Sequence, residues 1–184
     1  MSSDLALFRR RLLRNPKQIS AIAPSSRALA TAMTDGLGPH TGRVVEFGPG
    51  TGRLTRAVLD RGIAPHDLTL FEMDAEFGHH LRKKFPSVHV YIGPAQDCTR
   101  KVAKGVKAVI SGLPLLSMPV GLRRDIVMAA FSILAPGAPM IQFTYGLRAP
   151  LPAELIEELS LSVEVGALVW ANLPPARVFR FRRG

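Results

Sequence analysis

The chain has 184 residues, 47% of them hydrophobic and 21% charged, which suits one globular domain with a hydrophobic core. A formal net charge of +10 favours a polyanionic partner, either nucleic acid or an anionic membrane surface. The single cysteine excludes an internal disulfide, and no apolar run is long enough to span a bilayer. The histidines lack zinc-ligand spacing, so we expect no metal, and we expect a cytoplasmic protein that is soluble or peripheral on the membrane.

The first segment, 1–40, is interpreted as a helical module that binds membrane or substrate, placed before a domain of residues 41–184. The stretch "LALFRRRLLRNPK" predicts a basic amphipathic helix, although arginine intrudes on its apolar side. Such a helix is typical of membrane-surface binding, while a helix packed on the domain and an RNA-binding helix are the alternatives. The residues expected to bind the membrane are Phe8, Arg9, Arg10, Arg11, Arg14 and Lys17.

The next stretch, "ISAIAPSSRALATAM", predicts an alanine-rich helix that begins after Pro24. Ser25 is expected to be its N-cap, because serine side chains accept hydrogen bonds from the free N–H groups of a first turn. The functional alternative is that Ser25 and Ser26 receive a phosphate of the substrate at this helix N-terminus.

Short β-branched or apolar runs then alternate with helical segments, which predicts right-handed crossovers and a parallel sheet. The last two predicted strands have only "ANLPP" between them, so we expect them to form a closing antiparallel pair. The predicted strands are 43–47, 68–72, 88–91, 106–111, 139–145, 159–170 and 176–183, and the main predicted helices are 53–61, 75–85 and 119–134.

The turn "VVEFGPGTGRLT" joins the first strand to the first helix of this domain. Gly48, Gly50 and Gly52 let the backbone turn tightly and approach a ligand at the helix N-terminus. The third glycine comes one residue earlier than in the G-x-G-x-x-G fingerprint, and Glu46 would repel a pyrophosphate, so a nicotinamide oxidoreductase is disfavoured. Glu46 suits an ammonium group or hydroxyls, and Glu72 is placed to accept both hydroxyls of a ribose.

The motifs "EFGPGTGRLT", "LFEMD", "GPAQD" and "VISGLP" resemble the class I S-adenosylmethionine-dependent methyltransferases over about residues 40–184. The resemblance implies an α/β fold with a Rossmann-like seven-stranded sheet and an antiparallel last strand, preceded here by the N-terminal helices. It implies S-adenosyl-L-methionine as cofactor and S-adenosyl-L-homocysteine as product. Glu46 and the glycine loop would hold the methionine end and Glu72 the ribose. Met73 would lie against the adenine, Asp97 would accept from its amine, and Ser111 would also contact the cofactor.

The strand end "SGLPLL" bears on the methyl acceptor. In methyltransferases that act on the exocyclic amines of bases, a tetrapeptide such as N-L-P-Y stands there, and its asparagine and ring hold a flipped base. This chain has Gly112 in place of the asparagine and Leu115 in place of the ring, so a base fits poorly and nucleic acid is disfavoured. We expect Gly112 to leave room for a bulkier amine beside an apolar wall that includes Leu115.

Together with "NPKQISAIAPSSRALA", "IQFTYG" and "NLPPARVFRF", these motifs resemble the bacterial phospholipid N-methyltransferases, which convert phosphatidylethanolamine stepwise toward phosphatidylcholine. The resemblance implies a phospholipid substrate at an anionic membrane surface. Relatives that methylate other amino-lipids, such as ornithine lipids, share the motifs. We place Tyr145, Ser111 and Gly112 at the reacting centre, with Tyr145 and Leu115 as substrate contacts, and we expect Phe143 and Trp170 in the core.

Two other functions stay open. The glycine motif is also similar to the ribosomal-RNA adenine dimethyltransferases, and the high positive charge favours a nucleic-acid methyltransferase of that kind. The second open function is a binding module without catalysis, which senses the cofactor or couples it to a membrane.

Overall fold

A computed structural model describes residues 26–145, 149–172 and 174–184. Ser25 and the expected membrane-binding residues, Phe8 to Lys17, lie outside these ranges. Within the described ranges, no helix has the length and apolar character needed to cross a membrane.

The core of the fold is a seven-stranded sheet with the strand order β3-β2-β1-β4-β5-β7-β6. Strands β1 to β5 are parallel, β7 is antiparallel to β5, and β6 is antiparallel to β7. The predicted seven-stranded sheet with its closing antiparallel pair is therefore confirmed. The strands are β1 (Val44–Phe47), β2 (Leu68–Glu72), β3 (His89–Ile92), β4 (Ala108–Ser111), β5 (Met140–Tyr145), β6 (Leu161–Val169) and β7 (Ala176–Arg183).

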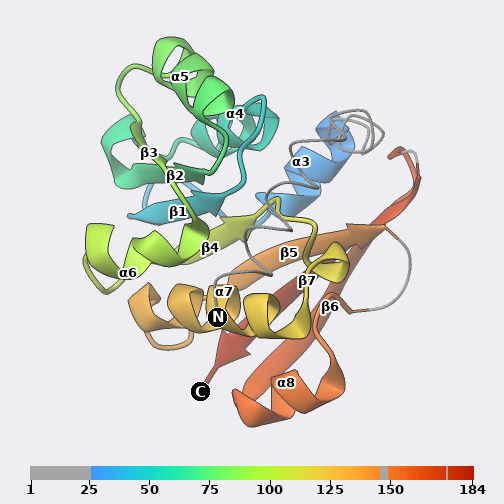
Figure 1. The fold of residues 1–184 in the computed structure, drawn as a ribbon. Coiled ribbons are helices and arrows are strands. Elements are labelled where there is room, and N and C mark those ends of the chain that lie inside the picture. Colours follow the sequence, from blue (N-terminus) through green and yellow to red (C-terminus); the bar gives the residue numbers. More distant parts are fainter. Residues whose placement is uncertain (1–25, 146–148, 173) are drawn as a thin grey trace.

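Helices cover both faces of this sheet, with α3, α4 and α5 on one face and α6, α7 and α8 on the other (Figure 1). The central strands β1 and β4 are buried along their whole length, as expected for parallel strands covered on both sides. The helices are α3 (Arg27–Met33), α4 (Arg53–Asp60), α5 (Ala75–Lys84), α6 (Cys98–Lys101), α7 (Val120–Ile133) and α8 (Ala153–Glu158), with 3-10 turns η1 (Pro65–Asp67), η2 (Ala95–Asp97) and η3 (Leu115–Ser117).

Helix α3 is capped by Ser26, whose side chain accepts from the N–H of Leu29, and not by Ser25 as predicted. The backbone N–H of Ser26 donates to Oδ1 of Asn172 over 2.9 Å, so the start of α3 is tied to the turn between β6 and β7. Leu29 and Met33 are buried in the core beneath α3. The described end of the predicted N-terminal module therefore packs on the sheet.

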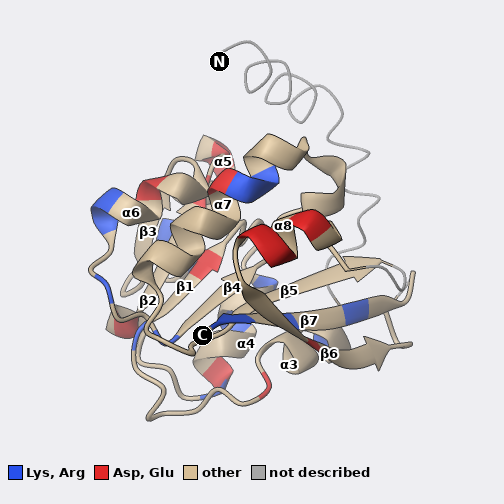
Figure 2. Cartoon of the chain, turned by 90° about the horizontal axis from the view of Figure 1, so that it is seen from below, with Lys and Arg blue, Asp and Glu red and all other residues tan. Residues whose placement is uncertain are grey.

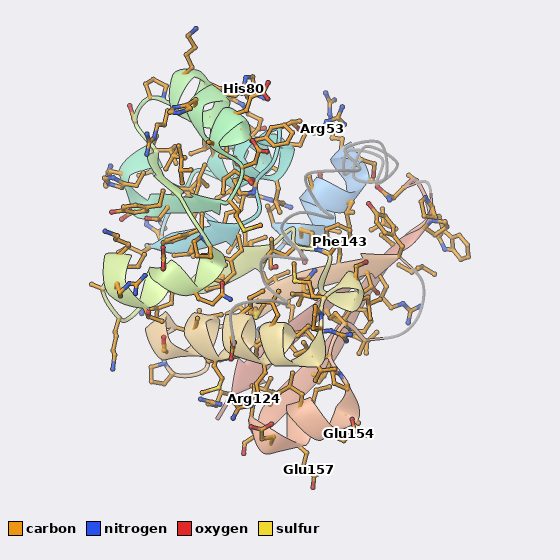
Figure 3. The ribbon with its side chains drawn as sticks, in the orientation of Figure 1. Arg53, His80, Arg124, Phe143, Glu154 and Glu157 are labelled. Carbon is orange, nitrogen blue, oxygen red and sulfur yellow. The ribbon has the colours of Figure 1, made fainter. Side chains whose placement is uncertain are left out.

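Charged residues are frequent on strand β7 and on helix α8. Figure 2 shows basic segments on β7 and acidic segments on α8. On β6, Glu164 pairs with Arg180 and Arg182, and Arg124 of α7 pairs with Glu158 of α8. Figure 3 shows Arg124 and the acids of α8 at one end of the molecule, and Arg53 near α3 at the other.

Candidate active site

The glycine loop between β1 and α4 adopts a backbone that only glycine accepts easily. Gly48, Gly50 and Gly52 have φ values of 67°, 52° and 79°, in the left-handed region. A Cβ atom on Gly48 would lie 2.7 Å from Cδ2 of Leu113, and one on Gly52 would lie 2.6 Å from the ring of Phe85. The loop is therefore held close to the β4 end on one side and to α5 on the other. Gly50 has open space where its side chain would be, which leaves its backbone accessible to a ligand.

Glu72 closes this loop from the end of β2. Its Oε2 accepts from the N–H of Gly50 and its Oε1 from the N–H of Asp74, each over 2.9 Å. Burial raises the pKa of the Glu72 carboxyl, and these two N–H donors oppose that rise. Each carboxylate oxygen has a further lone pair, so Glu72 can still accept the ribose hydroxyls expected of it.

Glu46 lies beneath the loop and is fully buried. Its Oε2 accepts from Oγ1 of Thr55 over 2.7 Å, whereas its Oε1 has no hydrogen-bond partner within the described part of the chain. Burial raises the pKa of Glu46 from 4.5 to about 8, and the Thr55 hydroxyl limits the rise. An unpartnered buried acceptor under a glycine loop fits the ammonium group of an amino-acid ligand.

A small cavity of about 120 Å³ opens beside Glu72 and leads toward β3. Met73 lines it, and its contact with an adenine stays a prediction. Asp97 lies in η2 just beyond, where it pairs with Arg100, and it is not among the residues that line the cavity. Gln96, which sequence reasoning missed, does line it. Oδ2 of Asp97 lies 3.1 Å from where a Cβ atom of Gly93, another lining residue, would stand. The only sequence signal for Gln96 was its position beside Asp97 in "GPAQD".

The loop after β4 lies against the glycine loop, and this corrects the expected role of Gly112. A Cβ atom at position 112 would lie 2.8 Å from the carbonyl oxygen of Gly48. The N–H of Gly112 also donates to the carbonyl of Phe47 over 2.8 Å. The space that a side chain at position 112 would occupy is therefore filled by the neighbouring backbone and is not available to a substrate. The function of Gly112 is to let the two loops meet, which an asparagine at this position would prevent.

Gln142 of β5, which sequence reasoning also missed, holds the same loop. Its Nε2 donates to the carbonyls of Leu113 and Phe143, each over 2.9 Å. The side chain is 1% exposed, and its Oε1 has no hydrogen-bond partner in the described ranges. Ser111, expected at the reacting centre, is fully buried next to Gln142 in the sheet register and accepts weakly from the N–H of Leu113. Gln142 and Ser111 thus support the loop from below.

A second cavity, of about 220 Å³, lies between this loop and the end of β5. Leu115 and Tyr145 both line it, as expected for substrate contacts, and the rings of Phe143 and Tyr145 meet edge to face at 5.4 Å. The hydroxyl of Tyr145 is buried, and burial raises its pKa. The remaining walls are mainly apolar but include two hydroxyl residues, and their members are Gly112, Leu113, Pro114, Leu116, Ser117, Phe143 and Thr144. We name this cavity the acceptor slot.

Phe143 is buried as expected, whereas Trp170 is 75% exposed and is not a core residue. Among the described residues, no group of histidine, cysteine, aspartate and glutamate is arranged to hold a metal ion. The site therefore consists of a glycine cradle with two acids, a cavity beside it and an apolar slot.

Solved structures with this fold include methyltransferases with varied substrates. A TehB-like SAM-dependent methyltransferase from Corynebacterium glutamicum aligns over 95% of this chain and 97% of its own, with a TM-score of 0.67 and 13% identity. An O-methyltransferase from Bacillus cereus in complex with SAH aligns over 95% and 90%, with a TM-score of 0.63 and 12% identity. Aeropyrum pernix fibrillarin with natively bound S-adenosyl-L-methionine aligns over 83% and 73%, with a TM-score of 0.60 and 17% identity.

The fold is that of the class I SAM-dependent methyltransferases, and the glycine cradle with its two acids fits S-adenosyl-L-methionine as cofactor. No family model matches the sequence. The ornithine lipid N-methyltransferase of Singulisphaera acidiphila is 31% identical over 149 residues, which cover 77% of this chain and 78% of that protein. The chain belongs to the family of this lipid N-methyltransferase.

Proposed function

We propose that this protein N-methylates the amine of a membrane amino-lipid, with ornithine lipid as the first candidate substrate. The observation that carries the proposal is the acceptor slot, a mainly apolar cavity that opens beside the cofactor cradle and includes Tyr145 and the hydroxyl residues Ser117 and Thr144. The sequence motifs alone favoured phosphatidylethanolamine. Because an ornithine lipid N-methyltransferase belongs to the same family, we favour ornithine lipid as the substrate.

The slot suits an amine better than a nucleobase. Base methyltransferases present an aromatic ring on which the base stacks, and that contact contributes about 1–3 kcal/mol per base. At the corresponding position this chain has Leu115, a buried aliphatic side chain. The close contact between Gly112 and Gly48 also leaves no space for the asparagine that would accept from a base amine. These features favour a flexible amine that extends from a lipid.

The slot also supports the chemistry of an amine nucleophile. When bound, S-adenosyl-L-methionine supplies a methyl group on a positively charged sulfur. An alkyl ammonium has a pKa near 10 in water, and the amine must lose its proton to expose a lone pair. Apolar walls disfavour the charged form, so the slot promotes loss of this proton to solvent. Leu115 and Phe143 perform this task by excluding water.

Tyr145 orients the neutral amine in this proposal. Its raised pKa keeps the phenol protonated at neutral pH, so it is a poor base. The phenol oxygen is buried near Asn172, so a rotation of the Tyr145 side chain must first expose it to the slot. It can then accept a hydrogen bond from an amine N–H and aim the lone pair. The ring centre of Phe143 lies 5.4 Å from the ring centre of Tyr145. Aromatic faces tolerate the methylated cation that forms.

The test is methyl transfer to vesicles. The full chain is incubated with methyl-labelled cofactor and vesicles that contain ornithine lipid, phosphatidylethanolamine or neither, and the lipids are separated by thin-layer chromatography. We expect label in ornithine lipid. Label only in phosphatidylethanolamine would restore the lipid that the motifs favoured, and no label in either lipid would overturn the proposal.

The proposed reaction takes place at a membrane surface. The basic helix expected within residues 1–17 would attract anionic lipids, with roughly 1 kcal/mol from each cationic residue near the leaflet. Removal of residues 1–16 should therefore reduce co-sedimentation with anionic liposomes and leave cofactor binding intact. Unchanged sedimentation of the truncated protein would rule out this helix as an anchor.

A further inference from the structure

Exposed apolar side chains gather at one edge of the sheet. Within the described ranges, seven large hydrophobic residues are exposed, and five of them follow the carboxyl ends of strands or begin the helices that come next. We call these five the carboxyl-edge rim: Met73 (38% exposed), Phe77 (39%), Leu116 (47%), Val120 (53%) and Trp170 (75%). The other two, Met128 and Val165, lie within α7 and within β6.

The strand register places the rim at the edge that holds the active site. Ala176 of β7 pairs with both Tyr145 of β5 and Val169 of β6, so β5 and β6 end at the same level. Trp170 directly follows Val169 and projects from the tip of this hairpin, where Figure 1 shows β6 ending. Met73 directly follows the last residue of β2.

Two residues of the rim also line the two cavities. Met73 lines the cavity beside Glu72, and Leu116 lines the acceptor slot. Scattered single apolar residues on a surface are ordinary, but an apolar ring around a site marks an interaction surface. A molecule that enters the slot therefore meets the exposed side chain of Leu116.

A basic groove starts at this edge and runs along α3 and α4 toward their C-terminal ends. It has a volume of about 650 Å³ between α3 and α4, and the one acid among its described lining residues is Asp60. Arg61 is held by Thr34 and Thr31, and Arg56 lies over the ring of Phe85, so these cations are pre-organised. Its basic lining residues are Arg27, Arg53, Arg56, Arg61 and Lys84.

The groove opens beside the rim. Arg27 is the first residue of α3. The hydrogen bond from Ser26 ties this helix start to Asn172, which comes two residues after Trp170 in the chain. Arg53 is the first residue of α4, directly after the glycine loop. An apolar rim flanked by cations complements the surface of a bilayer that contains anionic lipid, because the apolar groups enter the acyl boundary and the cations meet the headgroups.

We propose that the carboxyl-edge rim docks on the bilayer, with Trp170 and Val120 inserted and the basic groove against anionic headgroups. The amine headgroup then enters the acceptor slot while its acyl chains stay in the leaflet. This inference rests on the proposed function for its choice of a lipid bilayer as partner. It assigns membrane contact to a described face of the domain, separate from the basic helix expected within residues 1–17.

Trp170 is the only tryptophan in the chain, so its fluorescence reports on this face alone. We expect its emission to shift to shorter wavelength when the full chain meets vesicles with anionic lipid, and to be quenched by lipids brominated on their acyl chains. The change should be weaker with vesicles of purely zwitterionic lipid. Emission that stays at the aqueous wavelength while the protein co-sediments with the vesicles would overturn the inference.

Two matched substitutions give a second readout that does not use Trp170. Val120→Asp places a charge on the rim at the first residue of α7, where an acid is compatible with the helix. It should weaken vesicle binding roughly tenfold, the factor expected from losing burial of one valine. Met128→Asp changes an exposed residue of the same helix away from the rim and should not weaken binding. Equal effects of the two substitutions would overturn the inference.

Failure of this inference and failure of the proposed function give different results. If the full chain methylates an amino-lipid while Trp170 stays in water, the docking face is wrong and the activity stands. If Trp170 enters the bilayer but no amino-lipid is methylated, the docking face stands and the substrate is wrong.

Discussion

The backbone N–H of Gly50 donates to Oε2 of Glu72 over 2.9 Å, which ties the glycine loop to the acid at the end of β2. The second oxygen of Glu72 accepts from Asp74, the residue that caps α5. The glycine loop and the acid that we predict to face the ribose are therefore one hydrogen-bonded unit. Loss of the carboxylate should disturb both parts at once.

Replacement of Glu72 should remove cofactor binding. Glu72→Gln puts an amide against two N–H donors, and at least one of them loses its acceptor, so affinity for S-adenosyl-L-homocysteine should fall at least about tenfold. Glu72→Ala should abolish binding. Isothermal titration calorimetry measures both, with Glu76→Gln, an exposed residue in the first turn of α5, as the control. Normal affinity in Glu72→Gln would show that the tie to Gly50 is not needed.

Glu46 should make stability depend on pH. Its folded pKa is about 8 against a usual 4.5, so between these values the folded chain binds more protons than the unfolded chain. Its contribution to stability therefore falls as pH rises from about 4.5 to about 8, by at most about 1.4 kcal/mol per pH unit. Urea unfolding of the protein without cofactor, across this window, should show a flatter profile for Glu46→Gln.

A second substitution tests the cause of this dependence. Thr55→Val removes the hydroxyl that donates to Glu46, so the pKa of Glu46 should rise further. The loss of stability should then continue above pH 8. Identical profiles for wild type and Glu46→Gln would show that Glu46 is not the titrating group.

Gly112→Ala should disturb the contact between the glycine loop and the β4 loop. The new methyl group would meet the carbonyl of Gly48 at 2.8 Å, so one backbone must move, at a cost of about 1–3 kcal/mol in the free energy of unfolding. Cofactor affinity should fall with it. Gly121→Ala is the matched control, because its methyl group meets nothing within 4 Å in α7 and should stabilise by about 0.5–1 kcal/mol. Thermal melting and cofactor titration measure the two effects, and equal stability of both variants would contradict the contact.

Tyr145→Phe should affect the amine and spare the cofactor. Loss of one hydrogen bond to the amine should lower kcat/KM for the amino-lipid roughly tenfold, with cofactor affinity unchanged. The other tyrosine of the chain, Tyr91, stacks on Phe71 and serves as the control through Tyr91→Phe. If kcat/KM stays the same in Tyr145→Phe, the phenol does not orient the amine.

The sequence by itself determined the sheet, the glycine loop and the position of Glu72. Alternating strands and helices, glycines at a strand end and an acid at the next strand end are local patterns, and parallel strands bring their carboxyl ends to one edge. The exposure of Trp170 was not predictable in this way, because a tryptophan in an apolar strand has the same local pattern inside the core or at a hairpin tip.

Only the tertiary structure decided how the loops at that edge meet. Gly112 faces the carbonyl of Gly48, and the side-chain amide of Gln142 donates to the carbonyl of Leu113. The partners in each of these contacts are far apart in the chain. The side chain of Ser26, not Ser25, caps α3, whose start is tied to Asn172 of the last hairpin. Such contacts depend on the distances between elements after packing, and no local pattern of residues contains those distances.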